Sequence, residues 1–388
     1  MAIAKNIAES IEKSSWIRKM FEEGAKLKSK FGDGNVFDFS LGNPDIDPPA
    51  KFFDTLAALS VKKAPGTYGY MPNAGYPSVR KSIADQVSRE FECDMPMDNI
   101  VMTCGAAGGL NIVLKTILNH GDNIIVSRPY FVEYGFYASN HGGQLKIADT
   151  NEDFSLNVEK IRDLIDDKTR AVLINSPNNP TGKIYSESEI IKLTSMLKSS
   201  GKDIYLISDE PYREIVYSGH KVPSILKHYP LSIVVNSYSK TLSIPGERIG
   251  YVAVSPLCNE IGLLMAGLIL CNRILGFVNA PGLMQRIVSE LGDVSVNVEA
   301  YRRRRDIFVS GLKSSGYKVP VPEGAFYIFC KSPIEDDVAF VKHLLKYNVL
   351  AVPGVGFGGP GYFRLAFCVS EDVIQRSLPK FKQAIEEL

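Results

Sequence analysis

Short runs of apolar and β-branched residues recur between about residues 50 and 280, and stretches of helical character separate them. The runs lie at residues 99–103, 123–126, 170–174, 204–207 and 233–236. Short runs that are apolar throughout are typical of parallel strands buried on both faces, and a helix between successive strands is typical of βαβ units. The pattern predicts an α/β fold with a mostly parallel sheet covered by helices.

The two ends of the chain show a different pattern. Residues 5–30 have the spacing of a charged amphipathic helix, and a turn-rich stretch with several prolines follows up to Pro49. After residue 285, helical stretches alternate with a few strand-like runs, which predicts a smaller α+β unit. These later segments are strand-like at 324–329 and 362–367 and helical at 337–347. The predicted division is a large domain at 48–284 and a small domain made of 1–47 and 285–388.

Composition and charge exclude several classes of partner. The chain has 44 Lys and Arg residues against 43 Asp and Glu, so it has no bulk attraction to nucleic acid or to an anionic membrane. The four arginines at 302–305 lie in a helix-like stretch and are interpreted as a solvated helix face with ion-pair partners. Residues 261–270 are apolar, but they number about half of the ~20 needed to span a bilayer, so we interpret them as a core helix.

The N-terminus and the cysteines predict a cytoplasmic protein. Residues 1–20 carry charges throughout and lack the apolar region of a signal peptide. The six cysteines are scattered, form no C-x-x-C pair and mostly have apolar neighbours. Such cysteines are typical of reduced and largely buried thiols.

Residues of unusual chemistry follow the predicted strands. Ligands of open α/β sheets bind outside the carboxyl ends of the strands, so residues in these positions are expected to share one large site. The positions are Gly105, Pro129, the segment 175–182, Asp209 and the segment 237–240.

The segment Ser237-Tyr238-Ser239-Lys240 is followed eight residues later by Arg248. Serine hydroxyls and a forked guanidinium bind phosphate well. The lysine can also act as a nucleophile toward an aldehyde, such as the one that pyridoxal 5′-phosphate carries. A surface loop with incidental basic residues would show the same local pattern.

Three further segments offer groups that such a cofactor needs. Asp209 ends a hydrophobic run, so its carboxylate is expected at the strand's carboxyl edge, where it can pair with a protonated pyridine nitrogen. Tyr212 and Asn179 can each donate a hydrogen bond to a ring oxygen, and the glycine-rich residues 105–109 open an apolar helix whose backbone N–H groups suit a phosphate. Taken singly, each segment has an ordinary explanation, such as a helix cap, a core tyrosine or a small turn.

Several motifs, in their order along the chain, resemble those of the class I/II aminotransferases of the fold-type I superfamily, whose cofactor is pyridoxal 5′-phosphate. They are Asn179-Pro-Thr-Gly182, Asp209-x-x-Tyr212, Ser237-x-x-Lys240, the arginine at Lys240+8 and Phe363-Arg364-Leu365. The matching segments run from Gly42 to Arg364, nearly the whole chain. The resemblance implies a mostly parallel, seven-stranded-type sheet and ping-pong transfer of an amino group from an L-amino acid to a 2-oxo acid, with no metal.

The resemblance also implies roles for individual residues. Lys240 would bind the cofactor as a Schiff base and move a proton at the substrate's α-carbon, and Asp209 would pair with the ring nitrogen. The remaining cofactor-binding residues would be Tyr212 and Asn179 at the ring's 3-oxygen, Phe131 stacked on the ring, and Gly105, Ala106, Ala107, Ser237, Ser239 and Arg248 at the phosphate. The chain departs from the family at Phe131, where relatives often have Trp or Tyr, and at the two alanines, which leave only backbone donors.

Two matches concern the subunit and the substrate. Tyr70 matches a tyrosine that reaches the phosphate in the neighbouring subunit, which implies a homodimer with a shared active site; the alternative is an aromatic that packs a turn. Arg364 matches the arginine that binds the substrate's α-carboxylate, with help from Asn179 and the Gly42 amide; the alternative is an ion pair at a strand edge.

The residues leave the substrate's side chain open. A dicarboxylate usually needs a second cation, for which Arg273 is a candidate, although a helix-end arginine explains it equally well. Lys115 and the arm residues Trp16 and Ile17 can also shape the pocket. Aspartate with 2-oxoglutarate is the first expectation, and aromatic and alanine-type substrates stay open.

Three other functions compete with this interpretation. Another fold-type I enzyme, such as a C–S β-lyase, would share every cofactor residue. A regulator that binds the cofactor without turnover would need a DNA-binding segment, and no helix-turn-helix is apparent. A nucleotide-binding module would need a G-x-G-x-x-G motif after its first strand, which the chain lacks.

Overall fold

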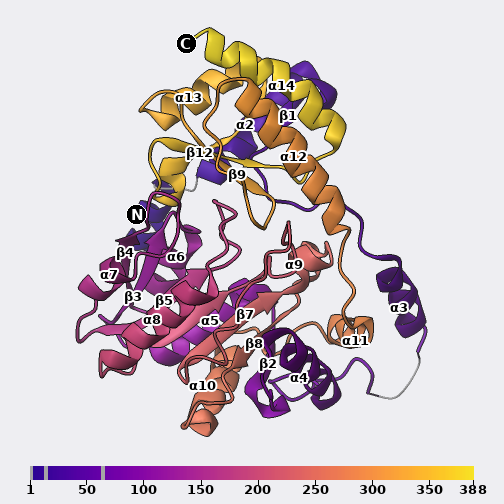
Figure 1. Cartoon of the computed structure of the whole chain (residues 1–388). Coiled ribbons are helices and arrows are strands. Elements are labelled where there is room, and N and C mark those ends of the chain that lie inside the picture. The colour runs from indigo at the N-terminus through magenta and orange to yellow at the C-terminus, as the bar shows by residue number, and fades with distance from the viewer. Residues whose placement is uncertain (1–2, 13–15, 63–65) are drawn as a thin grey trace.

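The computed structural model describes residues 3–12, 16–62 and 66–388. Its largest element is a seven-stranded sheet with the order β2-β8-β7-β6-β5-β3-β4, in which every neighbouring pair is parallel except the two pairs that include β8 (Figure 1). The α/β fold class predicted from the strand pattern is confirmed. The strands are β2 (Ile100–Thr103), β3 (Asn123–Arg128), β4 (Gln144–Asp149), β5 (Thr169–Asn175), β6 (Tyr205–Asp209), β7 (Ser232–Ser237) and β8 (Gly250–Val254).

Each of the five predicted strand runs coincides with one of these strands, whereas β4 and β8 were missed. Strand β4 lies at the edge of the sheet and is largely exposed, so its sequence Gln-Leu-Lys-Ile-Ala-Asp is not a continuous apolar run. Strand β8 is fully buried, but it begins with a glycine only three residues after the 3-10 helix Pro245–Glu247.

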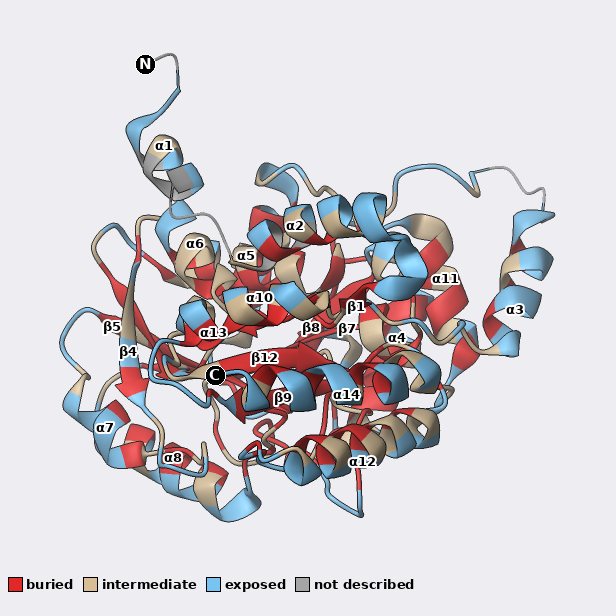
Figure 2. Cartoon of the chain, turned by 90° about the horizontal axis from the view of Figure 1, so that it is seen from above, coloured by how far each residue is buried: buried red, intermediate tan, exposed pale blue. Residues whose placement is uncertain are grey.

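Helices cover both faces of the large sheet, and alternate side chains along each strand fill two separate cores. On β7, for example, Ile233 and Val235 belong to one core and Val234 to the other. Figure 2 shows the buried strands between helices whose outer faces are exposed. One face packs against α5 (Gly105–Ile117), α6 (Glu133–Asn140) and α10 (Ile261–Ile274). The other packs against α3 (Ala50–Ser60), α4 (Pro77–Phe91), α7 (Val158–Asp163), α8 (Glu187–Ser199) and α11 (Gly282–Leu291).

A second, smaller assembly joins the two ends of the chain. A two-residue strand from the N-terminal part pairs in parallel with one from the C-terminal part, and a three-stranded antiparallel sheet has the order β11-β12-β9. A third core, rich in aromatic residues, lies here. The elements are β1 (Phe37–Asp38), β9 (Tyr327–Lys331), β10 (Val349–Leu350), β11 (Val352–Pro353), β12 (Tyr362–Ala366), α2 (Trp16–Phe31), α12 (Val298–Ser314), α13 (Asp337–Leu344) and α14 (Glu371–Glu386).

The short remaining elements connect these assemblies. The stretch predicted as one helix at 5–30 holds α1 (Lys5–Glu12) and α2, and residues 13–15 between them lie outside the described residues. Helix α11 runs across the predicted domain boundary at 284/285, and the division into two domains remains a proposal. The other short elements are α9 (Tyr238–Thr241) and the 3-10 helices Asp33–Asn35, Met97–Asn99, Pro245–Glu247, Leu345–Tyr347 and Gly354–Phe357.

Two predictions about surface segments need correction. Arg302, Arg303 and Arg304 form ion pairs as expected, but Arg305 is only 6% exposed; it pairs with Asp306 and donates a hydrogen bond to a backbone carbonyl. Helix α10 is not buried all round, because its apolar side chains at Leu263, Leu270 and Ile274 are exposed. None of the helices that the structure describes is long and apolar enough to cross a membrane.

Candidate functional site

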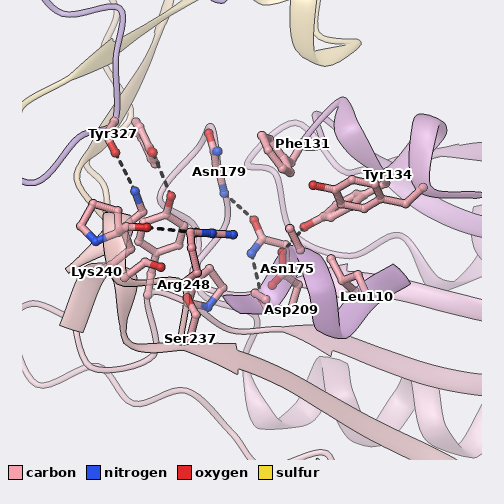
Figure 3. A pocket seen from close by; sticks show the side chains of 18 of the residues that line it. Leu110, Phe131, Tyr134, Asn175, Asn179, Asp209, Ser237, Lys240, Arg248 and Tyr327 are labelled. Carbon is pink, nitrogen blue, oxygen red and sulfur yellow. Dashed lines mark hydrogen bonds between the residues drawn. The ribbon is translucent and has the colours of Figure 1, made fainter. Parts of the chain in front are cut away.

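A cavity of about 300 Å³ lies beyond the carboxyl ends of β5, β6 and β7, beside the first turn of α5 (Figure 3). Side chains from the small assembly complete it. Its lining residues are Gly42, Ala106, Ala107, Leu110, Phe131, Tyr134, Tyr137, Asn175, Asn179, Asp209, Pro211, Tyr212, Ser237, Ser239, Lys240, Pro245, Arg248, Tyr327 and Arg364.

Twelve of the fourteen residues predicted for the site line this cavity; Gly105 and Tyr70 do not. Gly105 lies directly behind the lining: its φ is +70°, and a Cβ there would come within 2.9 Å of an Arg248 side-chain nitrogen. Tyr70 is 94% exposed on this chain. Arg273, the candidate for binding a second substrate carboxylate, is exposed near the end of α10 and is not part of the lining.

The local sequence explains why the cavity walls lie where they do. Asp209 and Ser237 are the last residues of adjacent parallel strands, so both side chains emerge at the same edge of the sheet. Helix α5 begins two residues after β2 and lies directly on β7, because Gly109 leaves no side chain between them; a Cβ at Gly109 would come within 2.7 Å of Val235 Cγ1. The first turn of α5 thereby reaches the cavity.

Asp209 is the acid of the cavity and is 5% exposed. Its Oδ2 accepts a hydrogen bond of 2.6 Å from the Tyr134 hydroxyl, whereas its Oδ1 is buried and has no hydrogen-bond partner among the described residues. Burial raises the pKa of Asp209 to about 7; the Tyr134 hydrogen bond opposes that rise and the neighbouring Glu210 adds to it. The unpaired oxygen is therefore suited to a ligand that brings its own proton, such as a protonated ring nitrogen.

Lys240 projects into the same cavity from α9. Its Nζ donates a 2.7 Å hydrogen bond to the Gly42 carbonyl. Burial lowers the pKa of Lys240 to about 8, and the positive charges of Arg364 and Arg248 act in the same direction while Cys368 opposes them. With that pKa about a tenth of the lysine is neutral at pH 7, so the amine can act as a nucleophile or a base near neutrality.

Arg364 is the deepest cation, with 2% of its surface exposed. One Nη donates to Asn179 Oδ1 at 3.1 Å and the other to the Ser40 carbonyl at 2.5 Å. Its Nε is buried without a hydrogen-bond partner among the described residues, and burial lowers the pKa of the guanidinium. The aromatic faces of Tyr327 and Phe357 lie 4.6 and 4.7 Å from the guanidinium carbon. A fixed, incompletely satisfied guanidinium of this kind binds a carboxylate well.

A set of hydrogen-bond donors suited to an anion also lines the cavity. Helix α5 has no side-chain cap, so N–H groups of its first turn are free to bind an anion. Ser237 and Ser239 contribute hydroxyls, and Arg248 lies exposed at the mouth, where it donates to the carbonyls of Pro245 and Cys104. Hydroxyls, a guanidinium and a helix N-terminus together are typical of a phosphate site.

Several lining residues had no predicted role. Asn175 ties the loops together, because its side chain donates to the Asp209 carbonyl and accepts from the Asn179 amide. The Tyr212 hydroxyl lies 2.8 Å from the Tyr327 hydroxyl. The residues without a predicted role are Leu110, Tyr134, Tyr137, Asn175, Pro211, Pro245 and Tyr327. Of these, only Tyr134 could have been suspected from the sequence. It lies three residues after Phe131, and residues at that spacing lie on one side of a helical turn.

The cavity therefore combines a partly neutral lysine, a buried carboxylate with one free oxygen, a phosphate-type cradle and a guanidinium for a carboxylate. A phosphorylated aromatic aldehyde with a basic ring nitrogen would satisfy the first three groups, and an amino or oxo acid would satisfy the fourth.

Comparisons with known proteins agree with this chemistry. The family model described as aminotransferase class I and II matches residues 34–381. The chain is 32% identical over 384 residues to a protein named probable aspartate aminotransferase from Methanocaldococcus jannaschii, covering 96% of this chain and 98% of that one. It is 33% identical over 382 residues to a probable aspartate/prephenate aminotransferase from Aquifex aeolicus, covering 94% and 95%.

Solved structures give the same result. The crystal structure of an amino transferase from Eubacterium rectale superposes with a TM-score of 0.96 at 36% identity and covers 100% of this chain and 99% of that one. The aspartate aminotransferase of Thermus thermophilus, solved with maleate, superposes with a TM-score of 0.87 at 27% identity, covering 99% and 100%.

Proposed function

The chain belongs to the class I and II aminotransferases, and from that premise we propose that the cavity is the active site and that Lys240 is the residue that binds the cofactor. As a member of this family the protein is an aminotransferase that depends on pyridoxal 5′-phosphate. The observation that carries the assignment of the site is the joint placement of Lys240, Asp209 and Arg364 in one buried cavity.

The residues present fit the cofactor. The free Oδ1 of Asp209 is the acceptor that a protonated pyridine nitrogen needs, and the lysine that would bind the aldehyde lies in the same cavity. Phosphate would bind at the first turn of α5, where Gly105, Ala106 and Ala107 supply only backbone donors. The side chains that would hold the rest of the cofactor are Ser237, Ser239 and Arg248 at the phosphate, Phe131 on the ring, and Tyr212 and Asn179 at the 3-oxygen.

When bound, pyridoxal 5′-phosphate supplies an aldehyde for the covalent link and a ring that withdraws electrons from the substrate's α-carbon. Arg364 binds the substrate's α-carboxylate, and Asn179 fixes the guanidinium. Asp209 keeps the ring nitrogen protonated by holding a negative charge beside it. The Lys240 amine, whose pKa burial lowers to about 8, would remove the proton from the substrate's α-carbon and deliver the same proton to the cofactor carbon that carried the aldehyde.

We propose aspartate as an amino donor and 2-oxoglutarate as an acceptor, because several relatives are named aspartate aminotransferases. A panel of amino acids against 2-oxoglutarate, oxaloacetate and pyruvate tests this proposal. Release of pyruvate and ammonia from cystathionine without an oxo acid would instead support a C–S β-lyase.

A homodimer with a shared active site is also proposed. Tyr70 is almost fully exposed, and the exposed apolar side chains of Leu263, Leu270 and Ile274 lie along α10. Exposed apolar helix faces mark interfaces. Sedimentation equilibrium tests the proposal: a fully active monomer would contradict it. The free cysteines fit a cytoplasmic location, which we propose as well.

The decisive test of the site is borohydride reduction of the yellow holoenzyme followed by peptide mapping. The cofactor is expected on the peptide that holds Lys240, and the Lys240→Ala variant should carry no label. Label on a different lysine would overturn the assignment.

A further inference from the structure

We propose that Tyr327 is a positioning residue, whose hydroxyl orients the Tyr212 proton toward the cofactor and whose ring supports Arg364 against the substrate's carboxylate. This inference rests on the proposed function of the cavity. Nothing in the sequence motifs pointed to Tyr327, but it contacts both the residue expected at the ring's 3-oxygen and the one expected at the α-carboxylate.

Strand pairing explains how one side chain reaches both residues. Tyr327 is the first residue of β9, and it pairs with Ala366 of β12, whereas Arg364 pairs with Phe329. Residues two apart on a strand share a face, so Tyr327 and Arg364 are diagonal neighbours on the same face of the small sheet. The guanidinium carbon lies 4.6 Å from the centre of the Tyr327 ring. Figure 3 shows Tyr327 on the same side of the cavity as Lys240.

The surroundings leave Tyr327 little freedom. It is 2% exposed, and its ring meets the Tyr212 ring edge-on at 5.6 Å. Its hydroxyl lies against the Cα of Gly42, so closely that a Cβ on Gly42 would overlap it. Gly42 in turn accepts the Lys240 hydrogen bond through its carbonyl. A side chain held on three sides in this way can fix the direction of a hydrogen bond.

The number of protons determines that direction. The two hydroxyls lie 2.8 Å apart, and each has one proton to donate. If Tyr212 donates its proton to the 3-oxygen, Tyr327 must be the donor between the two hydroxyls. Burial raises the pKa of Tyr327 to about 12 and that of Tyr212 well above its ordinary value, so both protons are present at neutral pH. A donor chain of this kind strengthens its last hydrogen bond.

The hydroxyl and the ring can be tested separately. Tyr327→Phe removes only the hydroxyl, and Tyr327→Leu removes the ring as well. Tyr229→Phe is the matched control, because the Tyr229 hydroxyl is also buried and also makes one hydrogen bond, to the Ile204 carbonyl, away from the cavity. If the Leu variant fails to fold, Tyr327→Met, whose longer and more flexible side chain reaches further into the space left by the ring, gives the same comparison.

The hydroxyl is tested by the absorbance of the Lys240–cofactor linkage during a pH titration of the holoenzyme. A weaker hydrogen-bond donor at the 3-oxygen raises the proton affinity of the linkage. Tyr327→Phe should therefore raise the pKa of the linkage by roughly 0.2 to 0.5 of a unit. In a Tyr212→Phe background the same change should have no further effect, because Tyr327 acts through Tyr212. A titration identical to wild type, or an equal shift in both backgrounds, would overturn this part of the proposal.

The ring is tested by spectral titration of the holoenzyme with propionate and maleate. Tyr327→Leu should weaken carboxylate binding by roughly 3- to 30-fold, the range expected for a partly to fully desolvated cation–π contact, whereas Tyr327→Phe should bind as wild type does. Equal affinity in the Leu variant would refute the role of the ring. Failure of the wild-type protein to take up pyridoxal phosphate at Lys240 would refute the proposed function instead, so the two failures are distinguishable.

Discussion

Replacing Asp209 by Asn should make the cofactor-free protein more stable at neutral and alkaline pH. The carboxylate is buried, has one oxygen without a hydrogen-bond partner among the described residues and has a pKa of about 7, against 3.8 for an exposed aspartate. An asparagine has the same shape, keeps an oxygen for the Tyr134 hydroxyl and never has to carry a charge.

The sign follows from linkage. Because the pKa is raised in the folded state, the folded carboxyl keeps its proton while the unfolded one ionises. The Asp209 carboxyl therefore costs the wild-type protein no stability below about pH 4, and its effect lowers the free energy of unfolding as the pH rises from about 4 to about 7. A shift of about three units corresponds to roughly 4 kcal/mol in total, of which roughly 3 kcal/mol falls between pH 5 and pH 8.

Urea unfolding of the two cofactor-free proteins, at equal protomer concentration, measures this difference. The free energy of unfolding of Asp209→Asn relative to wild type should increase by roughly 3 kcal/mol from pH 5 to pH 8. Asp122→Asn is a control of opposite sign: Asp122 is buried too, but hydrogen bonds from Asn119 and Arg170 outweigh the burial and lower its pKa. That variant should be less stable than wild type at pH 8.

Adding the cofactor should reverse the order of stability, because a protonated ring nitrogen gives the Asp209 carboxylate the partner it lacks. Wild type should gain more free energy of unfolding than Asp209→Asn does, and the variant should lose at least about 100-fold in kcat. Parallel pH profiles for the two cofactor-free proteins would refute the reasoning, since they would mean that Asp209 ionises as readily in the folded as in the unfolded chain.

Two further substitutions test the substrate end of the cavity. Arg364→Lys keeps the charge but loses the forked guanidinium that donates to Asn179. KM for the amino acid should therefore rise at least about tenfold, while the absorbance of the cofactor stays unchanged. An unchanged KM would exclude Arg364 from carboxylate binding. Gly42→Ala would push its methyl group into the Tyr327 hydroxyl and should weaken carboxylate binding in the same spectral titration, whereas Gly246→Ala, which has open space for a Cβ, should not; equal behaviour of the two variants would show that the contact is unimportant.

The family, the fold class and the cofactor were predictable because the relevant signals are local. Short apolar runs marked five of the seven strands, and several of the residues just after them line the cavity, although Gly105 and Pro129 do not. Parallel strands all end at one edge, so Asp209 and Ser237, 28 positions apart in the sequence, become neighbours.

The partners of these residues could not be read from the sequence, since they depend on contacts between distant elements. Tyr134 reaches Asp209 across 75 positions, and Tyr327 reaches Tyr212 across 115. A tyrosine within an apolar run is compatible with an ordinary core position, and only the packing of α6 and β9 turns these two toward the cavity. Tyr70 is the opposite case: its predicted role lies in a neighbouring subunit, and its exposure on one chain is what that role requires.

The positively charged residues of the cavity bear on both cofactor binding and substrate choice. Among the lining residues that the structure describes, the cations are Lys240, Arg248 and Arg364, and the proposed function uses each of them, for the cofactor's aldehyde, its phosphate and the substrate's α-carboxylate. For a second carboxylate on the substrate we therefore propose a group from outside this lining, such as Arg273 of a neighbouring subunit in the proposed homodimer. Trp16 packs beside Gly356, next to the Phe357 that flanks Arg364, so the N-terminal arm also borders this end; the side chain of Ile17 lies outside the described residues. On this proposal, residues at the edge of the cavity select the substrate, and they can change while the residues that would hold the cofactor stay the same.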